Sequence, residues 1–399
     1  MASSLLRALF CILLLGAICA FCASVARGQA PRVGASAEAW GQLYRPAGLV
    51  NLEARLRDHP WLRLEAQVWG GESALASQDQ GDVVVLVLHA RDPEGHGDLR
   101  AGRFVLASGA VRPVHLDGAH VRAQADKGTS LEVFGGVPVV PRFAARAYDW
   151  LLGGRAAQRF ADHGALGVSF VERRDHGALM DRELGADLVF YLPHALSVSG
   201  RASYDLASRG VSEINVTGSW GQRQRRLELF GIVRNPSLLL PATSLFSVLS
   251  DVASHQAGVS GRVRVAPRLR LDGLLAYRGA GREHGVRALA SANLWLDDEG
   301  KGAIEGNITR DGVGDAAWTG LRALFYRDLI DALRLGSEVE LVLPDERRTG
   351  RLWPWARLSG RYAVNEHWHL GAAVEASASP QFSRMVQGLL RVGYEGGVL

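Results

Sequence analysis

Apolar and polar residues alternate with a period of two from about residue 49 to the end of the chain, in segments of roughly 9 to 14 residues. In one of them Leu269, Leu271 and Leu275 fall on one face, while Arg270 and Asp272 fall on the other. Successive side chains of a β-strand point to opposite faces. The pattern therefore predicts a long series of strands, each with one apolar face. Short clusters of Gly, Pro, Asp or Asn separate the segments, which is typical of antiparallel hairpins.

Either a second sheet, as in a propeller, or lipid could cover such apolar faces; three features favour lipid, and the lack of a repeat argues against a propeller. The segments are longer than average strands and match the roughly 9 to 11 residues of a tilted membrane-spanning strand. The opposite faces carry charged residues at mid-strand, which suits a wet interior. No repeat of the 40 to 50 residues typical of a propeller is visible. Aromatic residues on the apolar faces lie toward strand ends, where a girdle at the lipid interface belongs: Tyr204, Trp220, Tyr277, Tyr362, Trp368 and Tyr394.

The composition fits this picture and narrows the protein class. Apolar residues make up 47% of the 399 residues and charged residues 22%, which excludes an intrinsically disordered chain. The mean hydropathy of +0.02 excludes a multi-span helical membrane protein but suits strands in which every second residue is polar. The net charge of +4 is small for this length, so we expect no nucleic-acid partner.

Residues 1–30 resemble a secretory signal. Arg7 supplies the positive charge, residues 8–23 form an apolar run too short for a typical span, and small residues follow as candidate cleavage sites. We expect this segment to be removed, and residues 31–48 to form a periplasmic segment ahead of the barrel.

The three cysteines, Cys11, Cys19 and Cys22, all lie within the signal. Disulfide scaffolds, cysteine-ligated zinc and cysteine nucleophiles are therefore excluded in the remainder of the chain.

In its architecture the chain resembles bacterial outer-membrane β-barrel proteins of the porin-like kind. The resemblance covers the signal and residues 49–399, and it rests on hairpin repeats, not on one motif. The last segment fits, with Leu390, Val392 and Tyr394 on its apolar face, although Tyr394 is not terminal. The resemblance implies an all-β, antiparallel up-and-down transmembrane barrel of about 18 strands (roughly 16–20), an aqueous lumen and a place in the outer membrane.

Two inserts interrupt the predicted strands. Residues 141–164 have an amphipathic helical pattern, and residues 237–253 read as a short helix within a long loop. Counting strands back from a periplasmic C-terminus puts the first insert on the periplasmic side and the second on the outer side.

Three polar groups could in principle carry chemistry. We interpret all of them as turn or lumen residues, because two histidines make no metal site and salt bridges explain the carboxylates. They are His367 with His369, His115 and His120 around Asp117, and Asp181, Glu183 and Asp187 near Arg173. The Gly-x-Ser-x-Gly turn of many serine hydrolases is missing from the sequence. We therefore expect no catalytic residue, metal or cofactor, and no enzymatic activity.

Arginines on the polar faces are the main functional signal. Six of them come from three consecutive strands with one acid among them: Arg262, Arg264, Arg268, Arg270, Arg278 and Arg287, with Asp272. If those strands are neighbours, the guanidinium groups form a positive patch on the lumen wall that attracts anions. The alternative is that each arginine pairs with an acid and only stiffens the wall.

The sequence thus predicts an outer-membrane channel for solutes, with a preference for anions. A polymer-export barrel that delivers an acidic polysaccharide with periplasmic partners is the second interpretation, and a barrel with a structural or enzymatic role is the third. The expected partners are outer-membrane lipid and small solutes or an acidic polymer.

Overall fold

A computed structural model of the chain describes residues 32–42, 45–55, 61–72, 79–125, 128–140, 145–146, 149–222, 224–235, 253–314, 317–345, 352–378 and 385–396. Alternating sequence segments become long strands in these ranges, as the period of two predicts. The strands are β1 (Arg32–Gln42), β2 (Arg45–Arg55), β3 (Leu62–Glu72), β4 (Asp79–Arg91), β5 (Gly97–Ser108), β6 (Val111–Gln124), β7 (Thr129–Val140), β8 (Ala145–Arg146), β9 (Trp150–Arg159), β10 (Gly164–Asp175), β11 (Ala178–Leu192), β12 (Leu196–Asp205), β13 (Gly210–Gln222), β14 (Arg225–Arg234), β15 (Ser254–Ala266), β16 (Leu269–Ala280), β17 (Glu283–Trp295), β18 (Gly302–Asp311), β19 (Trp318–Ile330), β20 (Leu333–Pro344), β21 (Trp353–Ala363), β22 (Trp368–Ser377) and β23 (Met385–Gly396).

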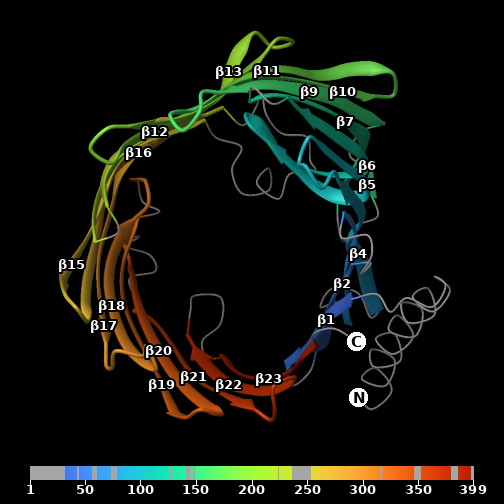
Figure 1. The fold of residues 1–399 in the computed structure, drawn as a ribbon. Coiled ribbons are helices and arrows are strands. Elements are labelled where there is room, and N and C mark those ends of the chain that lie inside the picture. The colour runs from blue at the N-terminus through green and yellow to red at the C-terminus, as the bar shows by residue number, and fades with distance from the viewer. Residues whose placement is uncertain are drawn as a thin grey trace.

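The strands form one closed antiparallel ring (Figure 1). Each long strand pairs with the next one along the chain, with β7 passing directly to β9, and β1 pairs with β23 to close the sheet, as in Ala35 opposite Gly396. Closure pairs the backbone groups of the first and last strands, which lipid demands of a sheet. The predicted up-and-down barrel is confirmed. Its strand number is near the predicted value of about 18 and somewhat above it.

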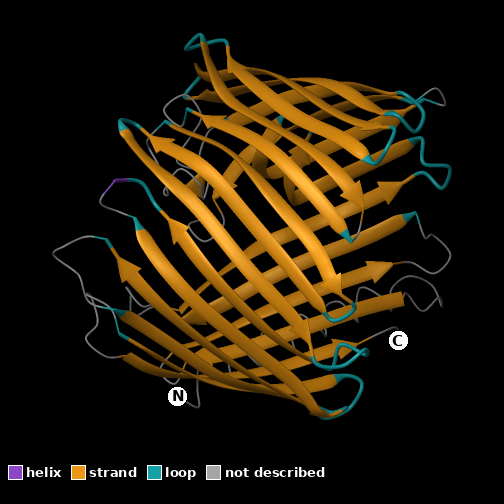
Figure 2. Ribbon diagram, turned by 90° about the vertical axis from the view of Figure 1, so that its left-hand side faces the viewer, coloured by secondary structure: helices purple, strands orange, loops and turns teal. Residues whose placement is uncertain are grey.

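The ring has two distinct ends (Figure 2). We call the end where β1 begins and β23 finishes the termini end, and the opposite one the far end. Connections at the termini end are short, such as those from β9 to β10 and from β15 to β16. At the far end β14 finishes at Arg234 and β15 begins only at Ser254, so the two strands are joined by a longer stretch of sequence. Short turns are typical of the periplasmic side of such barrels. The termini end is therefore assigned to the periplasm.

The two faces of the sheet differ as the sequence pattern predicts. Large apolar side chains stand exposed on the outside, among them Leu358, Leu390 and Val386 at 64%, 66% and 73%. Exposure to this degree across the whole sheet would be unfavourable in water, so the outer face is a lipid-facing band. Among the described residues, no helix is long and apolar enough to span a bilayer.

One hairpin leaves the wall. Pairing between β4 and β5 covers Leu86 to Arg91 and stops at Arg103, and pairing between β6 and β7 stops at Leu116. The hairpin tip, residues 104–115, instead lies against the inner faces of β7, β9, β10 and β11, which Figure 1 shows as a cyan segment inside the ring. Side chains of the tip and of the wall beneath it together build the apolar core of the described residues: Val87, Phe104, Leu106, Val111, Leu116, Phe134, Leu151 and Val171.

Three glycines opposite one another on adjacent strands allow the hairpin to bend. Gly102 faces Gly118, which in turn faces Gly136. A Cβ at Gly102 would collide with the backbone oxygen of Leu86, and one at Gly118 with the backbone oxygen of Gly135. Gly102 also has a φ of +123°, which favours glycine. This row of glycines therefore marks the place where the hairpin turns inward.

Two of the segment predictions are wrong. Residues 32–42, expected in a periplasmic segment over 31–48, form β1 and close the barrel. Residues 150–159, expected in a helical insert over 141–164, form β9, and β7 ends and β9 begins at the far end, not the periplasmic one. The run of small residues in β9 reads as helical in isolation, but pairing with β7 and β10 overrides that local preference. The predicted signal (1–30) and nearly all of the insert at 237–253 lie outside the described residues.

Candidate lumen site

Three of the predicted arginines gather on the inner wall near the termini end. Register places Arg262 of β15 opposite Asp272 of β16, and Arg264 opposite Arg270. Alternation turns all four side chains inward, because the outward positions between them are apolar, such as Leu271 at 40% exposure. Like charges directly opposite one another repel, so a feature other than pairing must hold Arg264 and Arg270 together.

Two residues, Asp272 and Trp295, hold this arginine cluster, which we define as Arg262, Arg264 and Arg270. Asp272 Oδ1 accepts from Arg262 Nε at 2.6 Å, and Asp272 Oδ2 accepts from Arg270 Nε at 2.8 Å. The guanidinium groups of Arg264 and Arg270 lie 5.7 and 5.4 Å from the ring centre of Trp295 in β17, a cation–π geometry. One carboxylate and one indole thus position three positive charges.

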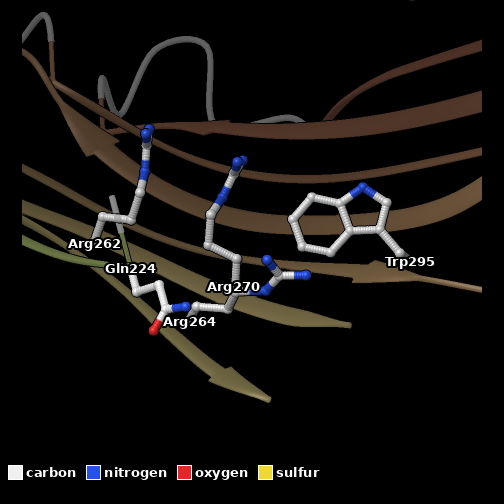
Figure 3. Close-up of a pocket in the computed structure, with 5 residues that line it drawn as sticks. All are labelled: Gln224, Arg262, Arg264, Arg270 and Trp295. Carbon is white, nitrogen blue, oxygen red and sulfur yellow. The ribbon is translucent and has the colours of Figure 1, made fainter. Parts of the chain in front are cut away.

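The cluster opens onto a cavity of about 420 Å³ lined by Gln224, the three arginines and Trp295. In Figure 3, Arg262 and Arg270 extend in parallel, and Arg264 turns toward Trp295. Arg264 donates to the backbone oxygen of Pro267, and no carboxylate pairs with it among the described residues. Two of the three guanidinium groups share the one carboxylate and Arg264 has none in the described part of the chain, so the cavity keeps positive charge and hydrogen-bond donors for an anion.

The other three predicted arginines lie elsewhere. Arg268 belongs to the turn after β15 and donates to Asp298 in the turn after β17, with Nε to Oδ1 at 2.8 Å. This hydrogen bond holds the pKa of the Asp298 carboxyl below its ordinary value. Arg278 and Arg287 lie toward the far end and share Asp311, with Arg287 Nε 3.6 Å from Asp311 Oδ2. The six predicted arginines therefore do not form one patch. Arg262, Arg264 and Arg270 make the cluster, Arg268 pairs with Asp298 between two turns, and Arg278 and Arg287 share Asp311.

The aromatic residues predicted to form a girdle lie on the outer face. Tyr204, Trp220, Tyr277, Tyr362 and Trp368 are exposed. Tyr394 is half-buried and packs on Trp368 with ring centres 4.9 Å apart. Their role at the lipid interface stays a prediction.

The polar group of His115, Asp117 and His120 is dispersed among separate partners in the structure. His115 bonds to the backbone oxygen of Val84, Asp117 accepts from Arg103 at 2.6 Å, and His120 contacts Glu132 at 3.2 Å. Each group therefore has a structural partner.

The carboxylates of β11 are salt-bridged to the wall and to the hairpin, as the sequence interpretation has it. Asp181 pairs with Arg173, and Glu183 with Arg112 of the hairpin. Asp187 accepts from Arg155 Nη2 at 2.6 Å. Buried charges persist only when paired, so this network ties the hairpin to the wall.

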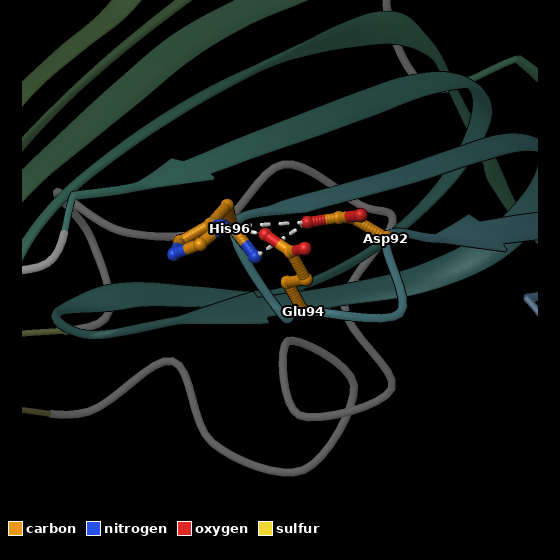
Figure 4. Close-up of side chains that lie close together, drawn as sticks. All are labelled: Asp92, Glu94 and His96. Atoms are coloured by element: carbon orange, nitrogen blue, oxygen red, sulfur yellow. Dashed lines mark hydrogen bonds and ion pairs between the residues drawn. The ribbon is translucent and has the colours of Figure 1, made fainter.

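One group of three possible metal ligands lies together among the described residues: Asp92, Glu94 and His96 in the turn from β4 to β5 (Figure 4). His96 Nδ1 is 3.6 Å from Asp92 Oδ2 and 3.4 Å from Glu94 Oε2, and all three side chains are exposed. Asp92 Oδ2 also accepts from the His96 backbone amide at 3.1 Å. The group stabilises a turn, and we assign no metal to it.

Comparison with known proteins supports the fold alone. No protein-family model matches the chain, and no curated protein matches its sequence. Solved structures do match. The siderophore receptor PirA from Pseudomonas aeruginosa is 10% identical with a TM-score of 0.60, over 92% of this chain and 80% of that one. The ferric-catecholate import receptor Fiu from E. coli K12 is 8% identical with a TM-score of 0.58, over 91% and 81%. The copper transporter OprC is 11% identical with a TM-score of 0.55, over 92% and 80%. By its fold the chain is a β-barrel of the bacterial outer-membrane type.

Proposed function

We propose that this chain is a channel of the bacterial outer membrane that passes water-soluble solutes and favours anions. The observation that carries the proposal is the arginine cluster, in which Arg262, Arg264 and Arg270 face the lumen around the single carboxylate of Asp272. Such an arrangement leaves positive charge on the wall of a barrel wide enough to hold water.

A charged lumen wall acts on solutes through its field. Low-dielectric walls focus field lines, so fixed positive charge raises the local concentration of anions and lowers that of cations. Arg264 adds hydrogen-bond donors that no carboxylate occupies in the described residues. We expect phosphate, carboxylate or sulfate groups to pass more readily than cations of the same size.

The test is the reversal potential of single channels in planar bilayers under a KCl gradient. We expect anion preference, weakened by Arg264→Glu and Arg270→Glu. The control is Arg282→Glu, which makes the same charge change in the turn between β16 and β17, away from the cluster. Cation preference in the unmodified protein contradicts the anion proposal, and complete lack of conductance contradicts the channel.

A second candidate is export of an acidic polymer, for which the place of the cluster is the supporting observation. The cluster lies toward the termini end, which the short turns assign to the periplasm. An exported chain would meet it first, delivered by periplasmic partners. Dextran sulfate should then block the current from the termini side at lower concentration than from the far side. Equal block from both sides, with normal polymer secretion in a deletion strain, contradicts export.

The same proposal covers the remaining expectations. The outer membrane is the location that this fold implies, and its lipid is the partner of the apolar outer face. The chain would need no metal or cofactor and would catalyse no reaction, because passage through a lumen requires neither.

A further inference from the structure

A second aromatic side chain lies on the inner wall in line with Trp295. Register places Trp295 of β17 opposite Ala303 of β18, and Ala303 opposite Tyr326 of β19. Both rings face the lumen, because their neighbours Leu294 and Phe325 stand exposed on the outer face. Ala303 is 1% exposed, so the two half-buried rings and not the alanine present the surface there. The rings thus stand two strands apart, about 10 Å along the wall.

Each ring has arginines beside it. Two guanidinium groups of the arginine cluster lie against Trp295, and that of Arg334 in β20 lies 5.1 Å from the ring centre of Tyr326. Arg334 Nη2 donates to Asp328 Oδ2 at 2.9 Å. Directly opposite Arg334, on β21, stands the exposed Arg361, with which no carboxylate pairs in the described part of the chain. A solute on either ring therefore lies next to unneutralised positive charge.

Groups that suit hydroxyls lie next to the rings. Asn293 and Glu305 occupy the next inward positions of β17 and β18, with Asn293 Nδ2 3.4 Å from Glu305 Oε2. Gln224 lines the cavity beside Trp295, whose volume of about 420 Å³ falls within the roughly 300–1,000 Å³ of small-molecule sites. Amides donate and accept hydrogen bonds, and a carboxylate accepts them. The wall thus combines flat apolar faces, cations and hydroxyl partners.

We propose that the row from Trp295 to Tyr326 is a binding track for a chain of acidic sugars, that is, pyranose rings that carry carboxylates. One face of a pyranose ring presents mainly C–H groups, so it packs on the flat face of a tryptophan or tyrosine. A carboxylate on the sugar then meets a guanidinium group, whose planar donors fit its two oxygens. The inference rests on the proposed anion-favouring lumen and names the class of solute that its wall would hold.

The spacing of the rings favours a chain over a small anion or a single sugar. An anion such as sulfate would bind the arginines and gain nothing from contact with Trp295 or Tyr326. One sugar cannot reach both rings, whereas a short chain can, and its second contact forms within a complex that already exists. We therefore expect affinity to rise with chain length.

Isothermal titration calorimetry of the full chain in detergent tests the track, with trigalacturonic acid as the probe. We expect saturable binding about ten times tighter than that of galacturonic acid, of maltotriose, which lacks carboxylates, and of tricarballylate, which lacks rings. Equal affinity for tricarballylate would mean that charge alone binds. Equal affinity for maltotriose would mean that the carboxylates contribute nothing, and equal affinity for the monomer that only one ring takes part. Each of these results overturns the proposal.

Two substitutions locate the binding. Tyr326→Leu removes the second ring and should weaken trigalacturonate binding about tenfold, whereas Phe325→Leu makes the same kind of change on the outer face of the strand and should leave it unaltered. Arg361→Gln alters an exposed side chain without loss of packing, so it serves if Tyr326→Leu does not fold. It should weaken the binding of trigalacturonate but not that of maltotriose. Unchanged binding in both inner-wall variants refutes the track.

Calorimetry separates this inference from the proposed channel, because binding requires no conductance. Trigalacturonate binding by a protein that conducts no ions keeps the track and contradicts the channel. Anion preference in bilayers without trigalacturonate binding keeps the channel and overturns the track.

Discussion

Arg103 donates through Nη1 to the backbone oxygen of Val83 at 2.9 Å, in the place where a neighbouring strand would donate a backbone amide. The same guanidinium holds Asp82 and Asp117, so one side chain joins β4 to β6 where the sheet between them ends. The five fixed donors of arginine suit this task, which lysine with its single ammonium cannot perform.

Replacement of Arg103 should destabilise the barrel. Arg103→Met removes the donor shared by Asp117, Asp82 and the Val83 backbone oxygen, and we expect a loss of about 1–3 kcal/mol in the free energy of unfolding. Urea titration in detergent, followed by the shift between folded and unfolded gel bands, measures it. Arg334→Met breaks an exposed pair with Asp328 and should cost less than about 1 kcal/mol. Equal effects of the two substitutions would argue against the role given to Arg103.

The glycine row should tolerate no side chain. Gly118→Ala puts a Cβ into the backbone of Gly135 and Gly136, and we expect a loss of about 1–3 kcal/mol in the same assay, because backbone cannot move aside cheaply. Gly306→Ala is the matched control, since no atom lies within 4 Å of its ideal Cβ. A neutral Gly118→Ala would show that the bend does not depend on this close approach.

The hairpin core should hold the tip against the wall. Phe134 is 1% exposed within that core, and Phe134→Ala should cost about 3–5 kcal/mol. Limited proteolysis of the folded variant should cut within residues 104–115, which the unmodified protein protects. Leu131→Ala, on the lipid-facing side of the same strand, should leave the protection intact. Cleavage of both variants at the same rate would mean that packing on Phe134 does not retain the hairpin.

Removal of the carboxylate at the arginine cluster should strengthen anion preference. Asp272→Asn takes away the negative charge that Arg262 and Arg270 share, so the reversal potential under a KCl gradient should move further toward that of chloride. Asp298→Asn, which removes an exposed carboxylate in a turn, should change it less. A shift toward potassium with Asp272→Asn would indicate that the arginines do not act on the permeating ions.

Two continuous apolar runs in the sequence mark the inward hairpin and the strand beside it. The run from Val83 to Leu88 breaks the alternation, and it belongs to β4, the strand from which the inward hairpin departs. Phe104, Val105 and Leu106 form a similar run in the hairpin. Such runs indicate burial on both faces. They do not tell whether a neighbouring sheet, a helix or a hairpin of the same barrel provides it.

The sequence by itself determined which residues face lipid and which face the lumen, because strand alternation is a local property that every hairpin repeats. It therefore placed Arg262, Arg264 and Arg270 on the inner wall and Leu271 and Leu275 outside. Only the tertiary structure decided that β1 and β9 belong to the barrel, that Trp295 and Asp272 hold the cluster, and that residues 104–115 fold inward. These features depend on contacts between strands distant in sequence, and a period of two carries no information about them.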